Sequence, residues 1–212
     1  MKSRPAVVVL AAGRGSRFSG LHHKLVQTLG ASTVLATTIS NALATHLPVL
    51  VVTTEPLAEF VGRHVATRDM VVLPPVGSPA SQALGMGYSI AAGVAARSDA
   101  SGWLILPADM PMIQTATLTQ VADELDGNAI AYAQHRGLRG HPVAFSAELY
   151  SELVMLTGDE GARRLLARYP AHGVEVDDPG VLLDVDTEDD LDRVRIAQRE
   201  MQFTLQRSAL GE

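Results

Sequence analysis

The sequence contains no cysteine, and only 4% of its 212 residues are aromatic. Without cysteine the chain forms no disulfide, has no thiolate nucleophile and builds no cysteine-based zinc site. The chain also has no excess of positive charge. It contains 17 lysines and arginines and 23 aspartates and glutamates, which gives a net charge of −6. This balance argues against nucleic acid or an anionic membrane as a partner.

Long hydrophobic runs are missing as well. The apolar stretch from Ala6 to Gly13 follows Lys2 and Arg4, like the core of a signal peptide, but it is short and Arg14 soon interrupts it. We therefore expect a cytoplasmic protein with no transmembrane segment. The length suits one α/β domain, which we expect over residues 1–205, followed by a frayed tail at 206–212.

No acidic residue occurs before Glu55. The first 54 residues carry a charge of +5 and the remainder carries −11. Eight acids lie between Asp177 and Asp192, with no lysine or arginine among them. A basic loop and an acidic segment in one fold could flank a metal–triphosphate complex, although a solvated helix start accounts for most of the acidic cluster.

Short apolar runs alternate with helical patterns along the chain, which predicts β-α-β units and a mostly parallel sheet. The helix at 188–205 has the clearest signals, because Thr187 and Asp190 form a capping box before an apolar stripe. We expect strands at 6–11, 48–53, 70–73, 102–106, 129–134 and 142–145, and helices at 34–44, 56–66, 82–96, 116–125, 160–169 and 188–205.

A glycine-rich loop with cations follows the first expected strand. Residues 10–24 read LAAGRGSRFSGLHHK. Gly13 and Gly15 let backbone N–H groups approach an anion, while Arg17 and Lys24 supply positive charge. This combination predicts a phosphate site, with a nucleotide as its ligand.

Two common nucleotide motifs do not fit this loop. A P-loop ends in Gly-Lys-Ser/Thr, whereas Gly20 is followed by Leu21 and His22. A dinucleotide fingerprint needs a third glycine where this chain has Phe18. His22 and His23 are unusual residues for such a loop. They could contact phosphate when protonated, but we expect them to be solvated.

Ligands of open parallel sheets bind at the carboxyl ends of the strands. There, residues 106–111 read LPADMP, and a carboxylate at Asp109 is well placed for Mg²⁺, although an aspartate can also bond its own turn. Gly85, Gly87 and Ser89 lie near a helix start, where N–H donors and small side chains suit a nucleoside. The turn at 135–145, HRGLRGHPVAF, has donors for a second anion, or else solvated side chains.

These motifs together resemble a known family. The glycine loop, LPADMP and the Gly-x-Gly-x-Ser at 85–89 resemble the nucleotidyltransferases that activate a phosphorylated acceptor with an NTP. RGHPVAFS at 139–146, GDEGAR at 158–163 and DVDT at 184–187 resemble the molybdenum cofactor cytidylyltransferases of the MobA-like NTP transferase superfamily. Asp159 also suits a helix N-cap.

The resemblance implies a single Rossmann-like, three-layer α/β/α domain whose mostly parallel sheet has an antiparallel strand near the C-terminal half. It implies transfer of CMP from CTP to molybdopterin with release of pyrophosphate, Mg²⁺ as cofactor and a molybdoenzyme that receives the product. Arg17 and Lys24 would bind the triphosphate. Asp109 would bind Mg²⁺ with Asp184, which we prefer to Asp186 because the latter lies closer to the helix cap. The nucleotide would contact Leu10, Ala11, Ala12, Gly13, Gly15, Ser16, Gly85, Gly87 and Ser89, and the acceptor would contact Arg139, His141 and Arg163.

Other functions stay open at this point. The seven-residue step from Arg17 to Lys24 resembles sugar-phosphate and sugar-alcohol nucleotidyltransferases, so the acceptor could be a sugar phosphate or another small phosphate. A small group similar to these transferases reduces a pigment with a nicotinamide cofactor. A non-catalytic cofactor-binding protein is a third alternative. Pyrophosphate release separates the transferases from the other two.

Overall fold

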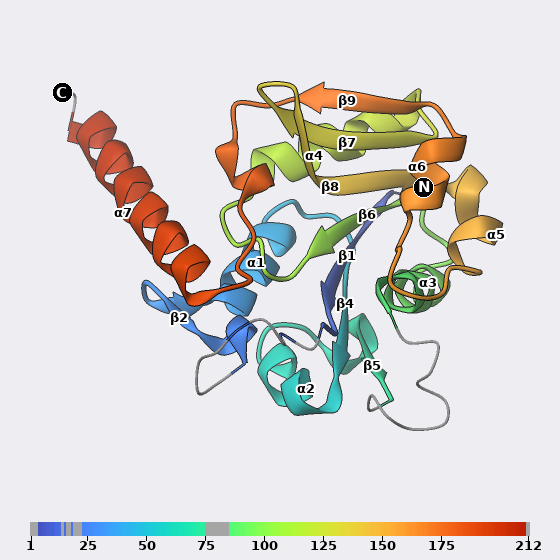
Figure 1. Ribbon diagram of the computed structural model, residues 1–212, viewed down its shortest axis with the longest axis horizontal. Helices are drawn as coiled ribbons and strands as arrows, with labels where there is room; N and C mark the ends of the chain where they lie inside the picture. The colour runs from blue at the N-terminus through green and yellow to red at the C-terminus, as the bar shows by residue number, and fades with distance from the viewer. Residues whose placement is uncertain (1–3, 14, 16–17, 19–22, 75–84, 211–212) are drawn as a thin grey trace.

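The computed structural model describes residues 4–13, 15, 18, 23–74 and 85–210. Its centre is a seven-stranded sheet (Figure 1). In spatial order the strands are β5 (Met70–Leu73), β4 (Val49–Thr54), β1 (Ala6–Ala11), β6 (Gly102–Pro107), β8 (Leu138–Ser146), β7 (Ile130–His135) and β9 (Ala171–Glu175).

The sheet is mostly parallel, as the sequence predicts. β8 pairs antiparallel with both β6 and β7, and the other neighbouring strands pair parallel. β1 lies inside the sheet, and its residues alternate between two hydrophobic cores, with Val7 and Val9 in one and Ala6 and Val8 in the other. A strand covered on both faces needs a continuous apolar run, which explains the sequence AVVVLA.

Helices cover both faces of the sheet and complete the three-layer α/β/α fold (Figure 1). The first core contains buried residues of α1 (Val34–Leu43), α2 (Glu55–Gly62), α4 (Thr115–Asp123) and α7 (Glu188–Leu210). The second contains residues of α3 (Met86–Ala96), α5 (Tyr150–Leu153) and α6 (Arg163–Arg168). A hairpin of β2 (Thr28–Leu29) and β3 (Ser32–Thr33) precedes α1. The 3-10 turns are η1 (Lys24–Val26), η2 (Thr67–Asp69), η4 (Glu124–Asp126), η5 (Ala147–Leu149) and η6 (Pro179–Leu182).

Several element boundaries differ from the prediction. β8 begins at Leu138 rather than at residue 142, and α3 begins at Met86, because Gly85 is its extended N-cap. The expectation that Asp159 caps a helix is wrong, since α6 begins at Arg163 after an Ala162 cap. β9, the short hairpin and α5 were not predicted, because glycines and short lengths hide their periodicity.

The long C-terminal helix begins as the sequence predicts. The N–H of Thr187 donates to Asp190 Oδ2 at 2.9 Å, and the N–H of Asp190 donates to Thr187 Oγ1 at 3.2 Å, forming the capping box. The hydrogen bond from the Thr187 side chain is the main cause that lowers the pKa of Asp190. The helix continues to Leu210 instead of ending at residue 205, since no glycine or proline interrupts it.

Candidate active site

Three strand ends meet at one edge of the sheet. β1 and β6 run parallel, so Ala11 and Pro107 end together. β8 runs in the opposite direction, and Val143 pairs with Ile105, so the beginning of β8 lies at the edge where β6 ends. The topology therefore brings the glycine loop, the turn at Asp109 and the residues around His141 to one place.

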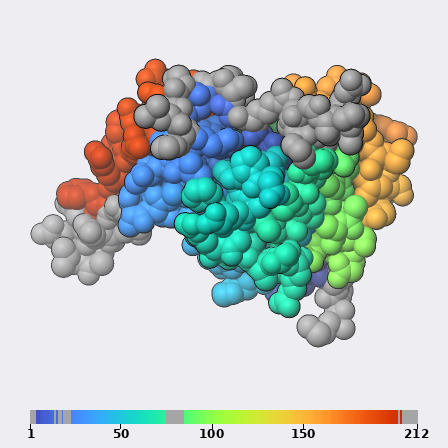
Figure 2. Space-filling model, turned by 90° about the horizontal axis from the view of Figure 1, so that it is seen from below, coloured from blue at the N-terminus to red at the C-terminus, as the bar shows by residue number. Residues whose placement is uncertain are grey.

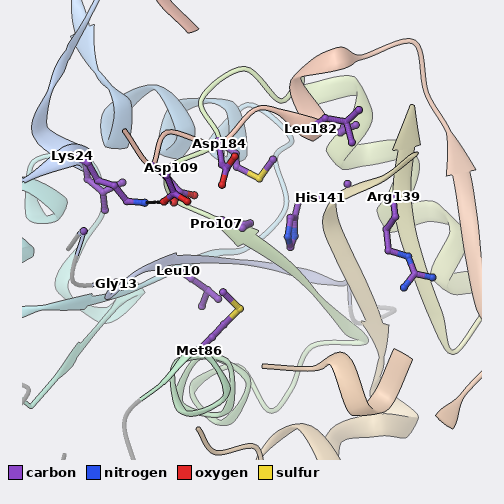
Figure 3. Close-up of a pocket in the computed structure, with 16 residues that line it drawn as sticks. Leu10, Gly13, Lys24, Met86, Pro107, Asp109, Arg139, His141, Leu182 and Asp184 are labelled. Atoms are coloured by element: carbon purple, nitrogen blue, oxygen red, sulfur yellow. Dashed lines mark hydrogen bonds and ion pairs between the residues drawn. The ribbon is translucent and has the colours of Figure 1, made fainter. Parts of the chain in front are cut away.

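Lys24 is the buried cation of this site. Its Nζ lies 2.6 Å from Asp109 Oδ2 and 2.7 Å from Asp186 Oδ1, and its side chain is only 9% exposed (Figure 3). Burial acts to lower the pKa of Lys24, but the attraction and hydrogen bonds of the two carboxylates outweigh it and raise the pKa. The ammonium is therefore charged and positioned at the beginning of η1.

The segment Asp184-Val185-Asp186 packs beside the Asp109 turn. The Val185 N–H donates to the Asp109 carbonyl at 2.9 Å, and the Val185 side chain is fully buried. Asp184 and Asp186 both line the cavity that Lys24 lines. Burial, followed by the nearby carboxylates of Asp186 and Asp109, raises the pKa of Asp184. Asp186 thus belongs to the site together with Asp184, the residue that we preferred from the sequence.

A buried aspartate anchors the same segment. Asp178 Oδ2 accepts from the Gln114 N–H at 2.8 Å and from Thr117 Oγ1 at 2.7 Å, and its Oδ1 accepts from the Gly180 N–H at 3.0 Å. These bonds join η6 to the beginning of α4. The acidic cluster of the sequence therefore has three parts: an anchor at Asp178, cavity-facing acids at Asp184 and Asp186, and the start of α7.

His23 holds the glycine loop, contrary to the expectation that it is solvated. Its Nδ1 accepts from the Leu25 N–H at 3.2 Å, and its Nε2 lies 3.1 Å from the Gly13 carbonyl. This pattern fits the neutral ring with its proton on Nε2. A Cβ at Gly15, where φ is +60°, would lie 3.3 Å from the same Nε2, so the loop packs closely on the ring.

A central cavity of about 470 Å³ opens between the glycine loop, Lys24 and the carboxylates of Asp109 and Asp184 (Figure 3). It joins the glycine loop to the beginning of β8. Eight of the predicted site residues line it: Leu10, Gly13, Gly15, Lys24, Asp109, Arg139, His141 and Asp184. The predicted residues Ser16 and Arg17 lie outside the residues that the structure describes.

A second cavity of about 460 Å³ adjoins the glycine loop on the side of α3. Ala12, Gly85 and Ser89 line it, while Ala11 is fully buried within the sheet. Gly87 has a packing role that the sequence did not reveal. Its N–H donates to the Gly158 carbonyl at 2.9 Å, and a Cβ there would lie 2.7 Å from the Thr157 carbonyl oxygen.

A third cavity of about 520 Å³ lies beyond His141 and has an apolar floor that includes Ile105 and Phe145. Arg139 and Arg163, both exposed, line it. The guanidinium of Arg139 lies 4.0 Å from the centre of the Tyr132 ring, a cation–π contact, and Figure 3 shows this arginine beyond His141 as viewed from Lys24. The residues expected to contact an acceptor are thus grouped together.

His141 is a polar side chain that lines both the central and the third cavity. Burial lowers its pKa, against the attraction of Asp109 and a backbone hydrogen bond at Ile105. Its Nδ1 is buried and has no hydrogen-bond partner among the described residues. A buried polar atom without a partner costs about 1–3 kcal/mol, so this side chain is held in place at some cost in stability.

The donor set suits a hard divalent cation. Among the described residues, no three or more His, Asp and Glu side chains form a complete metal cage. Asp109, Asp184 and Asp186 nevertheless place carboxylates around one cavity. Mg²⁺ typically binds one or two carboxylates and keeps waters and substrate phosphates in its other positions, so these residues fit it.

A strand-end glycine loop, a buried lysine and cavity-lining carboxylates are groups that suit a nucleotide-dependent transferase on an α/β fold. The chain belongs to the family of the MobA-like NTP transferase domain, whose model matches residues 7–174. Its class is therefore nucleotidyltransferase, an enzyme that acts on an NTP. None of the described helices is long and apolar enough to cross a membrane.

Related proteins support this membership. The chain is 31% identical to the purine catabolism protein PucB of Bacillus subtilis over 90% of its own length and 95% of that protein. The crystal structure of Rv0371c from Mycobacterium tuberculosis superposes with a TM-score of 0.76 at 27% identity, covering 91% of this chain and 98% of the other. A manganese complex of Rv0371c gives a TM-score of 0.71 at 26% identity and the same coverage. Molybdopterin-guanine dinucleotide biosynthesis protein A from Archaeoglobus fulgidus shares the fold, with a TM-score of 0.67, 16% identity and coverage of 92% and 99%.

Proposed function

We propose that the protein transfers CMP from CTP to the terminal phosphate of molybdopterin and releases pyrophosphate, with Mg²⁺ as its metal. The observation that carries this proposal is the Lys24 ammonium, held between Asp109 and Asp186 at the end of a glycine loop. It combines a cation for phosphate and carboxylates for a metal in one cavity. The segments at 139–146 and 158–163, which resemble those of the molybdenum cofactor cytidylyltransferases, contribute residues to the adjoining cavity.

The triphosphate half of the site is assigned to the glycine loop. Among the described residues no heavy atom lies within 4 Å of the position that a Cβ would take at Gly13, which leaves room for phosphate oxygens close to the backbone there, and Lys24 and Arg17 supply the compensating charge. Asp109 and Asp184 would hold Mg²⁺, which when bound neutralises the charge that develops on the phosphates. The preference for CTP rests on the Ala11-Ala12-Gly13 opening, which is similar to that of cytidylyltransferases.

The acceptor half is assigned to the third cavity. Its apolar floor at Ile105 and Phe145 suits the face of a flat heterocycle, and its exposed arginines suit a phosphate. His141 lines both this cavity and the central one, so its imidazole lies at the boundary between the two halves of the site. A pterin with a terminal phosphate combines these features.

The reaction would be an in-line displacement. An oxygen of the acceptor phosphate forms a bond to the α-phosphorus of CTP, and the bond to the bridging oxygen of pyrophosphate breaks. The acceptor phosphate is ionised at neutral pH, so no side chain needs to remove a proton. The chain contributes by aligning two anions and neutralising their charge, which are the main sources of rate in phosphoryl transfer.

Pyrophosphate release with each of the four NTPs tests the proposal, using molybdopterin and a panel of sugar phosphates as acceptors, with and without Mg²⁺. We expect turnover with CTP, molybdopterin and Mg²⁺ together, and loss of turnover on chelation. Turnover with a sugar phosphate in place of molybdopterin would reassign the acceptor. Nucleotide binding without pyrophosphate would favour a binding protein, and nicotinamide oxidation without NTP turnover would favour the oxidoreductase.

A further inference from the structure

Met86 is an apolar side chain that stays half exposed in the middle of the site. It is the first residue of α3, and 49% of it is exposed. Of the described residues, it alone lines all three cavities. Figure 3 shows its side chain pointing from α3 toward the residues of the central cavity. A ligand in any of the three cavities is therefore within reach of this methionine.

The loop between α5 and α6 supports one side of Met86. Figure 1 shows this loop passing beside α3, and Figure 2 shows α3 (green) next to the part of the chain that contains α5 and α6 (orange). At Gly161, where φ is +56°, a Cβ would lie 3.0 Å from Met86 Sδ and 3.3 Å from its Cγ. The Gly87 N–H donates to the Gly158 carbonyl at 2.9 Å and joins the loop to α3. One side of the methionine thus rests on the loop, and its exposed part faces the cavities.

The chemistry of this side chain suits both proposed ligands. A methionine thioether is polarisable, makes favourable contacts with aromatic rings and adapts to irregular surfaces. The second cavity contains Gly85 and Ser89, which we expect to contact the nucleoside, and the third contains Arg139 and Arg163, which we expect to contact the acceptor. A nucleoside in one cavity and a pterin in the other would share Met86 as an uncharged wall.

We propose that Met86 is a positioning residue that contacts both the nucleotide and the acceptor and couples their binding. This role rests on the proposed function, because it needs ligands in two adjoining cavities. A half-exposed methionine has several rotatable bonds, and fixing them on binding costs conformational entropy. The first ligand to bind orders the side chain, so the second meets an ordered surface and binds more tightly. By linkage the gain is the same whichever ligand binds first.

Binding measured without turnover tests this coupling. The analogue α,β-methylene-CTP cannot transfer CMP, so calorimetry with Mg²⁺ gives its dissociation constant alone and with saturating molybdopterin. In the wild type we expect molybdopterin to lower this constant by about 3- to 10-fold, because the side chain is already ordered when the analogue binds. Met86→Ala should reduce the coupling to less than about 1.5-fold and weaken each ligand alone by about 2- to 5-fold, since an apolar contact is lost.

Two further variants separate this role from a general effect on the fold. Met155→Ala is the matched control, because this methionine is 76% exposed and lies outside the three cavities, so its constants and coupling should be those of the wild type. Met86→Leu keeps apolar bulk with fewer rotatable bonds. It should bind each ligand within about twofold of the wild type and couple them less. Circular dichroism and urea unfolding establish that each variant is folded.

Failure of this role and failure of the proposed function give different results. A wild type that binds both ligands without coupling, or a Met86→Ala variant that keeps the coupling, would overturn the role of Met86 and leave the proposed function in place. A wild type that fails to bind α,β-methylene-CTP or molybdopterin would overturn the proposed function, and the role of Met86 with it.

Discussion

The ammonium of Lys24 lies 2.6 Å from the carboxylate of Asp109, although 85 residues separate them in the chain. This ion pair joins the glycine loop to the end of β6, and Asp186 adds a second carboxylate at 2.7 Å. This pairing places a charged lysine and two carboxylates, those of Asp109 and Asp186, at one point of the cavity in the structure without substrate. It is the basis of the predictions about activity.

Lys24→Ala should lower the turnover number by about 10- to 1000-fold, as removal of one electrostatic contact does in such sites. The substitution removes the cation and leaves Asp109 and Asp186 facing each other, so affinity for NTP should fall as well. Pyrophosphate release at saturating and subsaturating NTP measures both effects.

Arg63→Ala provides the matched control for charge. Arg63 also pairs with an acid, Glu59 at 2.7 Å, but both side chains are exposed, and they lie at the C-terminal end of α2, where Arg63 is the C-cap. Exposed ion pairs contribute little to stability, so this variant should release pyrophosphate at the wild-type rate. Unchanged pyrophosphate release by Lys24→Ala would remove the lysine from the triphosphate site.

His23→Ala should raise the KM for NTP by about 3- to 10-fold, because it removes a hydrogen bond that holds the loop. The change in kcat should be smaller. His23→Asn separates the two contacts of the ring. Asparagine is a good N-cap and can accept from the Leu25 N–H, but its shorter side chain does not reach the Gly13 carbonyl. We therefore expect an intermediate KM.

His64→Ala serves as the control, because this histidine is exposed and lies outside the three cavities. Initial-rate kinetics with varied NTP give KM and kcat for all four proteins. An unaltered KM in both His23 variants would show that the ring does not position the loop.

Gly87→Ala should destabilise the protein by about 1–2 kcal/mol, even though alanine is the better helix former. The added Cβ would lie 2.7 Å from the Thr157 carbonyl oxygen, and backbone cannot move aside cheaply. Gly62→Ala is the opposite case, because no heavy atom of the described residues lies within 4 Å of the position that its Cβ would take near the end of α2. It should stabilise by about 0.4–1 kcal/mol.

Urea unfolding of the two glycine variants measures this contrast. A stabilised Gly87→Ala variant would mean that the segment at Thr157 does not pack against α3 in solution. A role for Gly87 would then have to come from contact with the nucleotide and not from packing.

Asp190→Ala should lower the free energy of unfolding by about 1 kcal/mol at pH 7 through loss of the capping box. The bonds with Thr187 lower the pKa of Asp190 below its ordinary value of 3.8, so its stabilising effect is fully present above pH 3.8. The effect is lost as the pH falls through the lowered pKa, because the protonated side chain caps less well. The difference from wild type should therefore shrink only at acid pH.

Asp189→Ala, one residue away and exposed, removes the same charge from the first turn without removing the cap. Urea unfolding between pH 7 and pH 3 compares the two variants. Equal losses at pH 7 would attribute the effect to helix-dipole charge rather than to the capping box.

Local sequence patterns predicted most of the fold. The apolar runs marked six of the seven strands of the central sheet, and the Thr187–Asp190 box placed the beginning of α7. β9 was not predicted, because its five residues include Gly173 and show no strong alternation of apolar and polar side chains. Helix ends were less predictable, since tertiary contacts lie beside them, such as the close approach of Gly158 to Gly85, the residue before α3.

The site was predictable where a motif follows a strand, as at Lys24 and Asp109. The pairing of Lys24 with Asp186 was not, because it joins segments 162 residues apart. One signal was nevertheless present, since Val185 is apolar between two acids, and such alternation places Asp184 and Asp186 on the same side of an extended segment. The role of His23 depends on the path of the loop, which no local pattern specifies.

The most direct test of the proposed function follows the α-phosphorus of CTP. Wild-type protein is incubated with molybdopterin, Mg²⁺ and CTP labelled at the α-phosphate, beside Asp109→Asn, and the label in the pterin product is compared with the pyrophosphate released. We predict one label transferred for each pyrophosphate, and a loss of about 10- to 1000-fold in Asp109→Asn. Pyrophosphate without label in the pterin, or undiminished transfer by Asp109→Asn, would contradict the proposal.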